Sequence, residues 1–221
     1  MPLSTHLSKG LWVMIDKKRM SYLAMVAVLS RLSVLFLLYL WSGLVWAKGG
    51  PHPPQQPGAY KIDSEHSAIQ FKAQHHDAGY TWGHFVRFKG TFETGKNGEL
   101  ISVQATARTR SVDTDNWFRD LHLRSAHYLA VWSNPVVQFH SETIEQADAG
   151  HWLVTGPLEL HGVILPLRVD VFKTGEGIGP FGNERYGLET EFTISLEEFG
   201  IVREGIGDEL QLFVNLEGVR R

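Results

Sequence analysis

The sequence predicts an all-β fold: an eight-stranded antiparallel β-barrel with a short helical insertion that forms a lid. Apolar and polar residues alternate along about eight segments, the pattern of strands with one buried face. Short turns separate most of these segments. Closing such a sheet into a barrel removes the exposed edges that an open sheet would leave. An eight-stranded barrel has room inside for side chains or for one slim ligand.

The first alternating stretch is Tyr60–Gly90. In its first half Ile69, Phe71 and Ala73 share one face of an extended segment, with polar residues between them. In its second half the alternation continues and only Phe85 breaks it. The shared face there carries His84, Val86, Phe88, Gly90 and Phe92. We therefore expect two strands of a sheet that has one solvated face.

Six later segments alternate in the same way and are predicted strands. They are Ile101–Ala107, Val136–Ile144, Trp152–Leu160, Val163–Phe172, Tyr186–Ile194 and Leu210–Leu216. Two intervals do not alternate. Gly175–Gly182 contains four glycines, so we predict a loop there. Ser111–Pro135 offers helix N-cap residues followed by tryptophan, phenylalanine and leucine, which predicts one or two short helices over an end of the barrel.

The N-terminus predicts an export signal at residues 1–47. Leu32–Ala47 is a hydrophobic run whose last residues, Val45 and Ala47, fit the −3 and −1 positions of a signal-peptidase site. An uncleaved membrane anchor remains the alternative, although the run is shorter than the ~20 residues of a spanning helix. Met20 is a second candidate start. Residues 48–58 are rich in proline and glycine and predict a linker, so the domain is expected at 59–221.

Charge and composition exclude several classes of protein. The chain of 221 residues has a net charge of −3, but residues 1–47 hold five basic residues and one acidic residue, so the remainder is near −7. Nucleic acid is an unfavourable partner for such a domain. The chain has no cysteine, which excludes disulfides, thiolate metal sites and cysteine nucleophiles.

No catalytic or metal-binding motif is present in the sequence. Histidines crowd the first half of the domain, yet H-E-x-x-H, G-x-S-x-G and Walker patterns are missing. His75 and His76 are adjacent and would point to opposite faces of a strand. Arg119 beside Asp120 is typical of a structural ion pair. We expect His66 to tie the first turn together, and we predict neither an enzyme nor a metal site.

The order of several short motifs resembles the YceI-like family. The match opens with Tyr60, Ile62, Asp63, His66, Ser67, Ile69 and Phe71, followed by His75, Gly83, Phe85, Phe88 and Gly90. It continues with Ser111–Thr114, Arg119–Ser125, Asn134–Phe139, Gly156–Val163 and Gly207–Asp208. Trp82, and the run His127, Tyr128 and Leu129, depart from the family pattern. The resemblance implies a secreted, lipocalin-like barrel that binds polyisoprenoid lipids.

On this resemblance we expect a carrier that holds a quinone or a prenyl phosphate by its tail. Aromatic residues are the predicted apolar lining: Phe71, Phe88, Trp117, Phe118, Tyr128, Phe139 and Phe192. The head group would lie at the barrel mouth, near His75, Trp82, Arg119 and His122. Phe71, Phe88, Phe139 and Phe192 could equally fill a solid core. Aromatic residues in the lid need an apolar slot to cover them.

The expected ligand is an isoprenoid lipid, with no other cofactor. The expected location is the periplasm or the exterior, or the inner membrane if the leader remains attached. Transient contacts with the membrane or with respiratory proteins, and a homodimer, are compatible with this function. Two alternatives remain open: a histidine-dependent metal or redox enzyme of the envelope, and a ligand-free stress or structural protein with a solid core.

Overall fold

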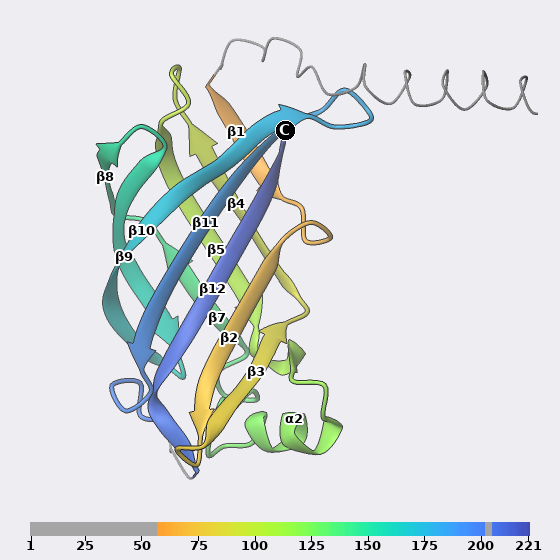
Figure 1. Ribbon diagram of the computed structural model, residues 1–221, viewed down its shortest axis with the longest axis vertical. Helices are drawn as coiled ribbons and strands as arrows, with labels where there is room; N and C mark the ends of the chain where they lie inside the picture. Colours follow the sequence, from red (N-terminus) through yellow and green to blue (C-terminus); the bar gives the residue numbers. More distant parts are fainter. Residues whose placement is uncertain (1–56, 202–204) are drawn as a thin grey trace, which may run out of the picture. The chain divides into compact units, whose positions relative to one another are not determined.

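The computed structural model describes residues 57–201 and 205–221 (Figure 1). The predicted leader at 1–47 and nearly all of the predicted linker at 48–58 lie outside the described residues. Residues His52–Arg221 form one compact unit, which contains the entire sheet and its cores. A unit of this size with its own core has what it needs to fold by itself. Within the described ranges, no helix has the length and apolar character needed to cross a bilayer.

The described residues form twelve strands and two short helices. The strands are β1 Gly58–Ile62, β2 Ala68–His75, β3 Gly79–Phe85, β4 Phe88–Thr94, β5 Leu100–Arg108, β6 Val112–Asp113, β7 Val136–His140, β8 Thr143–Asp148, β9 His151–Leu160, β10 Val163–Ile178, β11 Glu184–Ser195 and β12 Ile206–Arg220. The helices are a 3₁₀ turn, η1, at Thr109–Ser111, and α2 at Trp117–Leu123.

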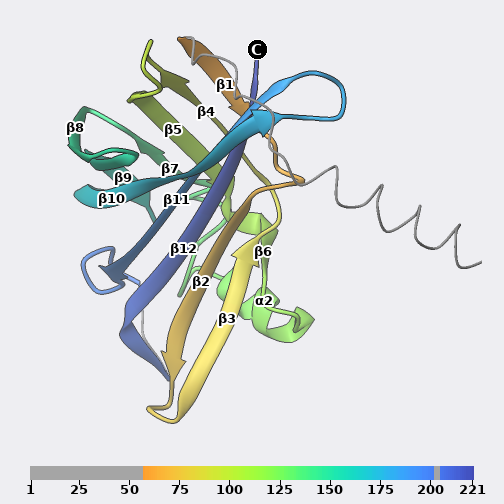
Figure 2. The ribbon, with the colours of Figure 1, turned by 45° about the horizontal axis from the view of Figure 1, so that its top comes forward.

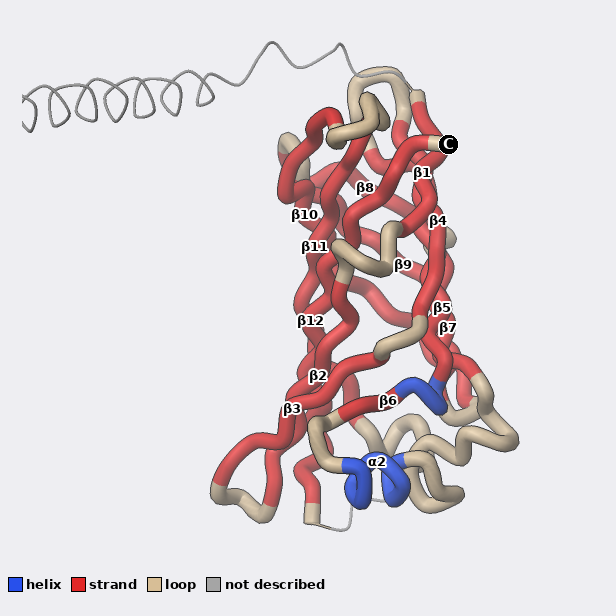
Figure 3. Tube along the Cα trace, turned by 90° about the vertical axis from the view of Figure 1, so that its right-hand side faces the viewer, coloured by secondary structure: helices blue, strands red, loops and turns tan. Residues whose placement is uncertain are grey.

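Eight of these strands close into an antiparallel barrel, as predicted. Their order around the barrel is β1, β4, β5, β7, β9, β10, β11 and β12. The last strand returns to the first, because Ile62 of β1 pairs with Gly218 of β12 and Tyr60 pairs with Arg220. Figure 3 shows the closed wall from the side. Because β1 pairs with β4 on one side and with β12 on the other, it has no unpaired edge.

The remaining strands extend the sheet beyond the closed wall. The long strand β12 pairs with β1 near its C-terminus and with β2 along Ile206–Asn215. β2 continues into the hairpin partner β3, and β3 pairs with β6 through His84 and Phe85. Figure 2 shows β3 and β6 next to α2, which lies at the end of the barrel away from β1. We call this end the α2 end.

Two predicted segments are divided in the structure. The expected single strand around His84–Phe92 is wrong: β3 ends at Phe85 and β4 starts at Phe88, because β3 pairs with β2 whereas β4 pairs with β1 and β5. Phe85 is therefore buried and Val86 exposed, the reverse of the prediction. Val136–Ile144 likewise divides into β7 and β8, which pair with β9 one after the other.

Two further predictions fail at bulges. Ile101 was expected to face inward with Val103, but the register of β5 against β4 shifts there, so Leu100 is buried and Ile101 is exposed. The predicted loop Gly175–Gly182 begins too early. β10 passes through a bulge after Lys173 and continues pairing with β11 as far as Ile178.

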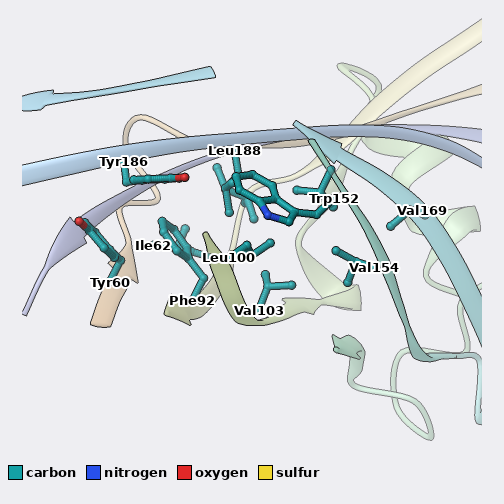
Figure 4. Close-up of a cluster of buried hydrophobic side chains, with 12 residues drawn as sticks. Tyr60, Ile62, Phe92, Leu100, Val103, Trp152, Val154, Val169, Tyr186 and Leu188 are labelled. Atoms are coloured by element: carbon teal, nitrogen blue, oxygen red, sulfur yellow. The ribbon is translucent and has the colours of Figure 1, made fainter. Parts of the chain in front are cut away.

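Side chains fill the barrel at the end opposite to α2, which we call the closed end. Phe92 stacks on Tyr60 with ring centroids 5.0 Å apart, and Tyr186 contacts both rings at 5.7 Å (Figure 4). The hydroxyl of Tyr186 donates to the carbonyl oxygen of Gly98. Burial raises the pKa of Tyr60 and of Tyr186 above the usual tyrosine range. Trp152 and neighbouring aliphatic residues pack against these three rings. We call this group of side chains the aromatic plug.

The turn between β1 and β2 is held by Asp63. His66 Nδ1 lies 2.9 Å from Asp63 Oδ2, and Asp63 Oδ1 accepts from the backbone N–H of Glu65, so the expected role of His66 is confirmed. Arg185 donates to Asp63 and to Glu217, which joins the turn to β11 and β12. The hydrogen bond with His66 is the main reason that the pKa of Asp63 lies below its usual value.

Asp63→Asn should make the fold less sensitive to acid. Because the folded-state pKa is lowered, the carboxylate stabilises the fold above about pH 4, and this stabilisation disappears as the pH falls through the folded pKa. We expect the variant to be roughly 1–2 kcal/mol less stable near neutral pH. Urea unfolding at about pH 6 and about pH 3 measures the loss of stability near neutral pH and the dependence of stability on acid. Equal acid sensitivity of variant and wild type would contradict the assignment.

Candidate functional site

Two adjoining apolar cavities lie inside the barrel. One, of about 330 Å³, is at the α2 end, and the other, of about 120 Å³, lies between it and the closed end. Phe85, Val137, Leu158 and Leu212 line both cavities. The two spaces therefore adjoin in the middle of the barrel, and we call the pair of cavities the channel; its inner end lies below the aromatic plug.

The walls of the channel follow from the alternation along the strands. The inward face of β9 carries Leu158 and Leu160, and the inward face of β12 carries Leu210 and Leu212. These aliphatic residues supply much of the wall and were not predicted as lining, although their alternation is the signal that identifies them. A wall of this chemistry binds alkyl surface without directional contacts.

Helix α2 and the residues before it are fixed by a buried polar network. Asn116 caps the helix through a hydrogen bond from Arg119 N to its Oδ1. Asp120 is buried, and its Oδ1 accepts from the backbone N–H and the hydroxyl of Thr114, at 2.9 and 2.6 Å. Arg124 donates to the carbonyl oxygen of Val112 at 2.6 Å. These bonds explain why the polar side of this short helix faces the barrel.

The cavity at the α2 end has a polar rim. Arg119 and His122 of α2, His75 of β2 and Thr81 of β3 line it together with apolar side chains. His75 and His122 are exposed to solvent, so the cavity reaches the surface beside them. The structure thus brings together three of the four residues predicted for the mouth, from segments about 45 residues apart.

Arg119 is held in place by Thr114 and keeps one nitrogen free. Its Nε donates to Thr114 Oγ1 at 2.8 Å, and its Nη2 donates to the Thr114 carbonyl oxygen at 2.5 Å. The third nitrogen, Nη1, has no hydrogen-bond partner within the described part of the chain. Asp120 pairs instead with Arg124, at 4.0 Å, so the predicted pair of neighbours Arg119 and Asp120 is not the one that forms.

Trp82, the fourth residue predicted for the mouth, lies on the outer face of the sheet. It stacks on Phe213 with centroids 5.3 Å apart, and the ammonium of Lys72 lies 5.5 Å from its ring. Thr81 and Gly83, its neighbours on β3, belong to the inward face of the strand, so Trp82 between them points outward.

The predicted lining residues fall into three groups. Phe71 and Tyr128 line the cavity at the α2 end, and Phe139 and Phe192 line the inner one. Phe88 packs against two of the cores without lining either cavity. The third group, Trp117 and Phe118, is exposed on the outer side of α2.

The histidines of residues 57–201 do not converge on a common point. His75 lines the cavity, whereas His76 lies in the following turn with a positive φ, and their rings meet edge to face at 4.3 Å rather than on opposite faces. Elsewhere in the described residues, Asp63, His66 and Glu217 bring one potential ligand atom each within 4.8 Å. Arg185 already forms ion pairs with both carboxylates there, which satisfies their charge.

The chain matches known sequences along the whole barrel. A family model described as the YceI-like domain covers residues 60–218. A UPF0312 protein of Pectobacterium atrosepticum is 38% identical over 169 residues, which are 73% of this chain and 86% of the relative. Protein YceI of Salmonella arizonae is 37% identical over 169 residues, with 73% and 87% covered.

Solved structures share the fold at lower sequence identity. BcnA of Burkholderia cenocepacia gives a TM-score of 0.64 at 19% identity, over 71% of this chain and 98% of that one. A polyisoprenoid binding domain of Saccharophagus degradans gives a TM-score of 0.54 at 15% identity, over 74% of this chain and 99% of that domain. These structures establish the shared barrel, and the sequence matches establish common descent. The chain therefore belongs to the YceI-like family.

Proposed function

We propose that the protein is a carrier that holds the tail of an isoprenoid lipid, a quinone or a polyprenyl phosphate, inside its barrel. The observation that carries the proposal is the apolar channel with a polar rim at one end and an aromatic plug at the other. A ligand suited to this space has a long apolar tail and one polar head. The polyisoprenoid binding domain of Saccharophagus degradans, which has the same fold, supports this class of ligand.

The size of the channel sets the length of tail that it can hold. An apolar cavity of about 150 Å³ accommodates a benzene ring. On that scale the 330 Å³ cavity holds roughly a dozen carbons, or two to three isoprene units, and the 120 Å³ cavity about one more unit. A longer tail would have to fold back or displace lining side chains, so a short tail is the better fit.

The rim suits an acceptor-rich head group. The free Nη1 of Arg119 is a cationic donor, and His75 and His122 offer ring nitrogens beside it. A phosphate would take charge-assisted hydrogen bonds from such a set, and a quinone carbonyl would take a neutral one. The carrier needs no reaction at the head group, so we assign it no catalytic role. The predicted N-terminal export signal favours a periplasmic or secreted location.

Native mass spectrometry followed by organic extraction tests the proposal. We would export a form beginning at Lys48 into a bacterial periplasm and purify it without detergent. We expect one isoprenoid per protein, at near-stoichiometric occupancy, with a chain length that the channel accommodates. A protein that is empty, and that fails to take up added quinone or polyprenyl phosphate, would refute the carrier. Stoichiometric metal in a tag-free preparation would favour an enzyme instead.

A further inference from the structure

Large apolar side chains gather on the outer side of the lid. Trp117 is 77% exposed, Phe118 68% and Leu121 59%, all on α2, and Trp132 is 80% exposed a short distance beyond it. The N–H of Val131, next to Trp132, bonds to the carbonyl oxygen of Arg124 at the end of α2, which keeps the loop against the helix. We call Trp117, Phe118, Leu121 and Trp132 the α2 face.

The α2 face has no packing role in the described structure. The inner side of the helix is anchored by the bonds of Asp120 and Arg124, and Leu123 and His122 line the cavity. The rings of Trp117 and Phe118 contact each other, at 5.7 Å, while both remain exposed. Large exposed apolar side chains that gather in this way mark an interaction surface.

The segment that carries the α2 face differs in charge from the rest of the barrel. Residues 108–132 hold four arginines and three aspartates, and one of those aspartates, Asp120, is buried and hydrogen-bonded to Thr114. The other described residues hold ten basic side chains against nineteen acidic ones. Arg110 lies 4.7 Å from the ring of Trp132, which places a cation beside an exposed aromatic. The segment that carries the aromatic α2 face thus has a net charge of +1 on an otherwise acidic domain, so this part of the surface complements an anionic surface better than the rest does.

The α2 face also lies at the channel mouth. Arg119 and His122 of the same helix line the cavity, while Trp117, Phe118 and Leu121 point outward. Figures 1 and 3 show α2 at one end of the barrel. A surface that contacted the α2 face would therefore lie directly beside the opening.

We propose that the α2 face docks on the surface of a bilayer that contains anionic phospholipid, and that docking places the channel mouth against the lipid from which the ligand is taken. The inference extends the proposed carrier function to its loading step. Tryptophan and phenylalanine favour the boundary between headgroups and acyl chains, and Arg110 beside Trp132 is placed to meet the phosphates. The contact is reversible, because one short helix buries too little surface for permanent anchoring.

Vesicle flotation with residues 52–221 tests the docking, since this unit contains the complete barrel. The vesicles are made of phosphatidylethanolamine and phosphatidylglycerol. The triple variant Trp117→Ser, Phe118→Ser, Leu121→Ser should bind at least about tenfold more weakly than wild type. The variant Arg110→Gln should bind these vesicles about fivefold more weakly than wild type. It should bind pure phosphatidylcholine vesicles as wild type does, because only the first membrane is anionic.

A matched control removes apolar side chains of similar exposure at the closed end. Ile101→Ser, Ile178→Ser, Phe181→Ser changes three exposed residues there and should float with vesicles as wild type does. Near-ultraviolet circular dichroism and thermal unfolding must show that both triple variants are folded. Equal binding by the α2-face variant and wild type, or equal loss in both triple variants, would overturn the proposal. A wild type that ignores vesicles but forms a dimer, which the α2-face variant dissolves, would also overturn it.

Ligand delivery separates this proposal from the carrier function. Isoprenoid is offered either in vesicles or as a soluble cyclodextrin complex. The α2-face variant should load normally from cyclodextrin and at least about tenfold more slowly from vesicles. If wild type floats with vesicles yet takes up no isoprenoid from either source, the carrier function fails and the docking stands. Equal loading rates from vesicles for variant and wild type would show that docking has no part in loading.

Discussion

Ala73→Trp should empty the barrel of lipid. Ala73 of β2 is buried, and its side chain lines the 330 Å³ cavity between Thr81 and Leu210. A tryptophan there would occupy the space of part of the ligand tail. Losing the burial of one five-carbon unit costs about 4 kcal/mol, at about 0.8 kcal/mol per buried CH₂, which is roughly a thousandfold in affinity.

The matched control is Gln70→Trp, on the same strand. Gln70 is exposed on the outer face, three residues from Ala73, so the control adds the same side chain without entering the channel. We expect the control to retain wild-type lipid occupancy in native mass spectrometry. Thermal unfolding of Ala73→Trp should stay close to that of empty wild type, since the new side chain fills a cavity. Full occupancy in Ala73→Trp would place the ligand elsewhere.

Phe92→Ala should cost about 3–5 kcal/mol of folding free energy, the range for a buried phenylalanine. Phe92 is 0% exposed and contacts Tyr60 and Tyr186 across the closed end. Its ring also lies close to the backbone of β12: a Cβ added at Gly218 would come within 2.4 Å of Phe92 Cζ. Because the backbone of β12 is already in contact with the ring, it has little freedom to move, and we expect a cavity to remain after the truncation.

Urea unfolding monitored by circular dichroism measures this loss. The melting temperature should fall by roughly 10 °C for a domain of this size. Phe181→Ala is the comparison, because Phe181 is exposed in the loop between β10 and β11. That variant should differ from wild type by no more than about 0.5 kcal/mol. Similar losses in the two variants would show that the aromatic plug does not stabilise the closed end.

The strand faces that the sequence predicted well are those in uninterrupted strands. Ile69, Phe71 and Ala73 lie inward as their alternation predicts, because β2 pairs regularly with β3 along its length. Alternation identifies which residues share a face, and it fails wherever a strand ends or slips. At Ile101 the slip depends on the register of β4, which a single-segment pattern does not contain.

The same limit explains the placement of Trp82. Treating His84 and Val86 as inward residues assigns Trp82 to the inner face as well, since all three have the same parity. The break between β3 and β4 changes that parity, so Phe85 and Gly83 point inward and Trp82 outward. A tertiary feature, the different partners of β3 and β4, therefore decides a local one.

The lid shows a second limit. An irregular, aromatic-rich segment predicts a cover, but it does not tell which of its side chains face inward. In the structure the polar bonds of Asp120 and Arg124 set the orientation of α2, and these bonds leave Trp117 and Phe118 outside. Hydrophobicity alone would have turned the helix the other way. The buried hydrogen bonds decide the orientation, because leaving buried polar groups unsatisfied costs more free energy than exposing the two aromatic side chains.

The aromatic plug at the closed end makes the channel a blind pocket. A tail that enters beside α2 cannot leave past Tyr60, Phe92 and Tyr186, so arrival and departure share one doorway. The first carbons to enter are the last to leave, and a new tail cannot push out an old one from behind. For the proposed carrier, each hand-over therefore passes through an empty barrel, and we expect the exchange of two lipids to be limited by the dissociation of the first.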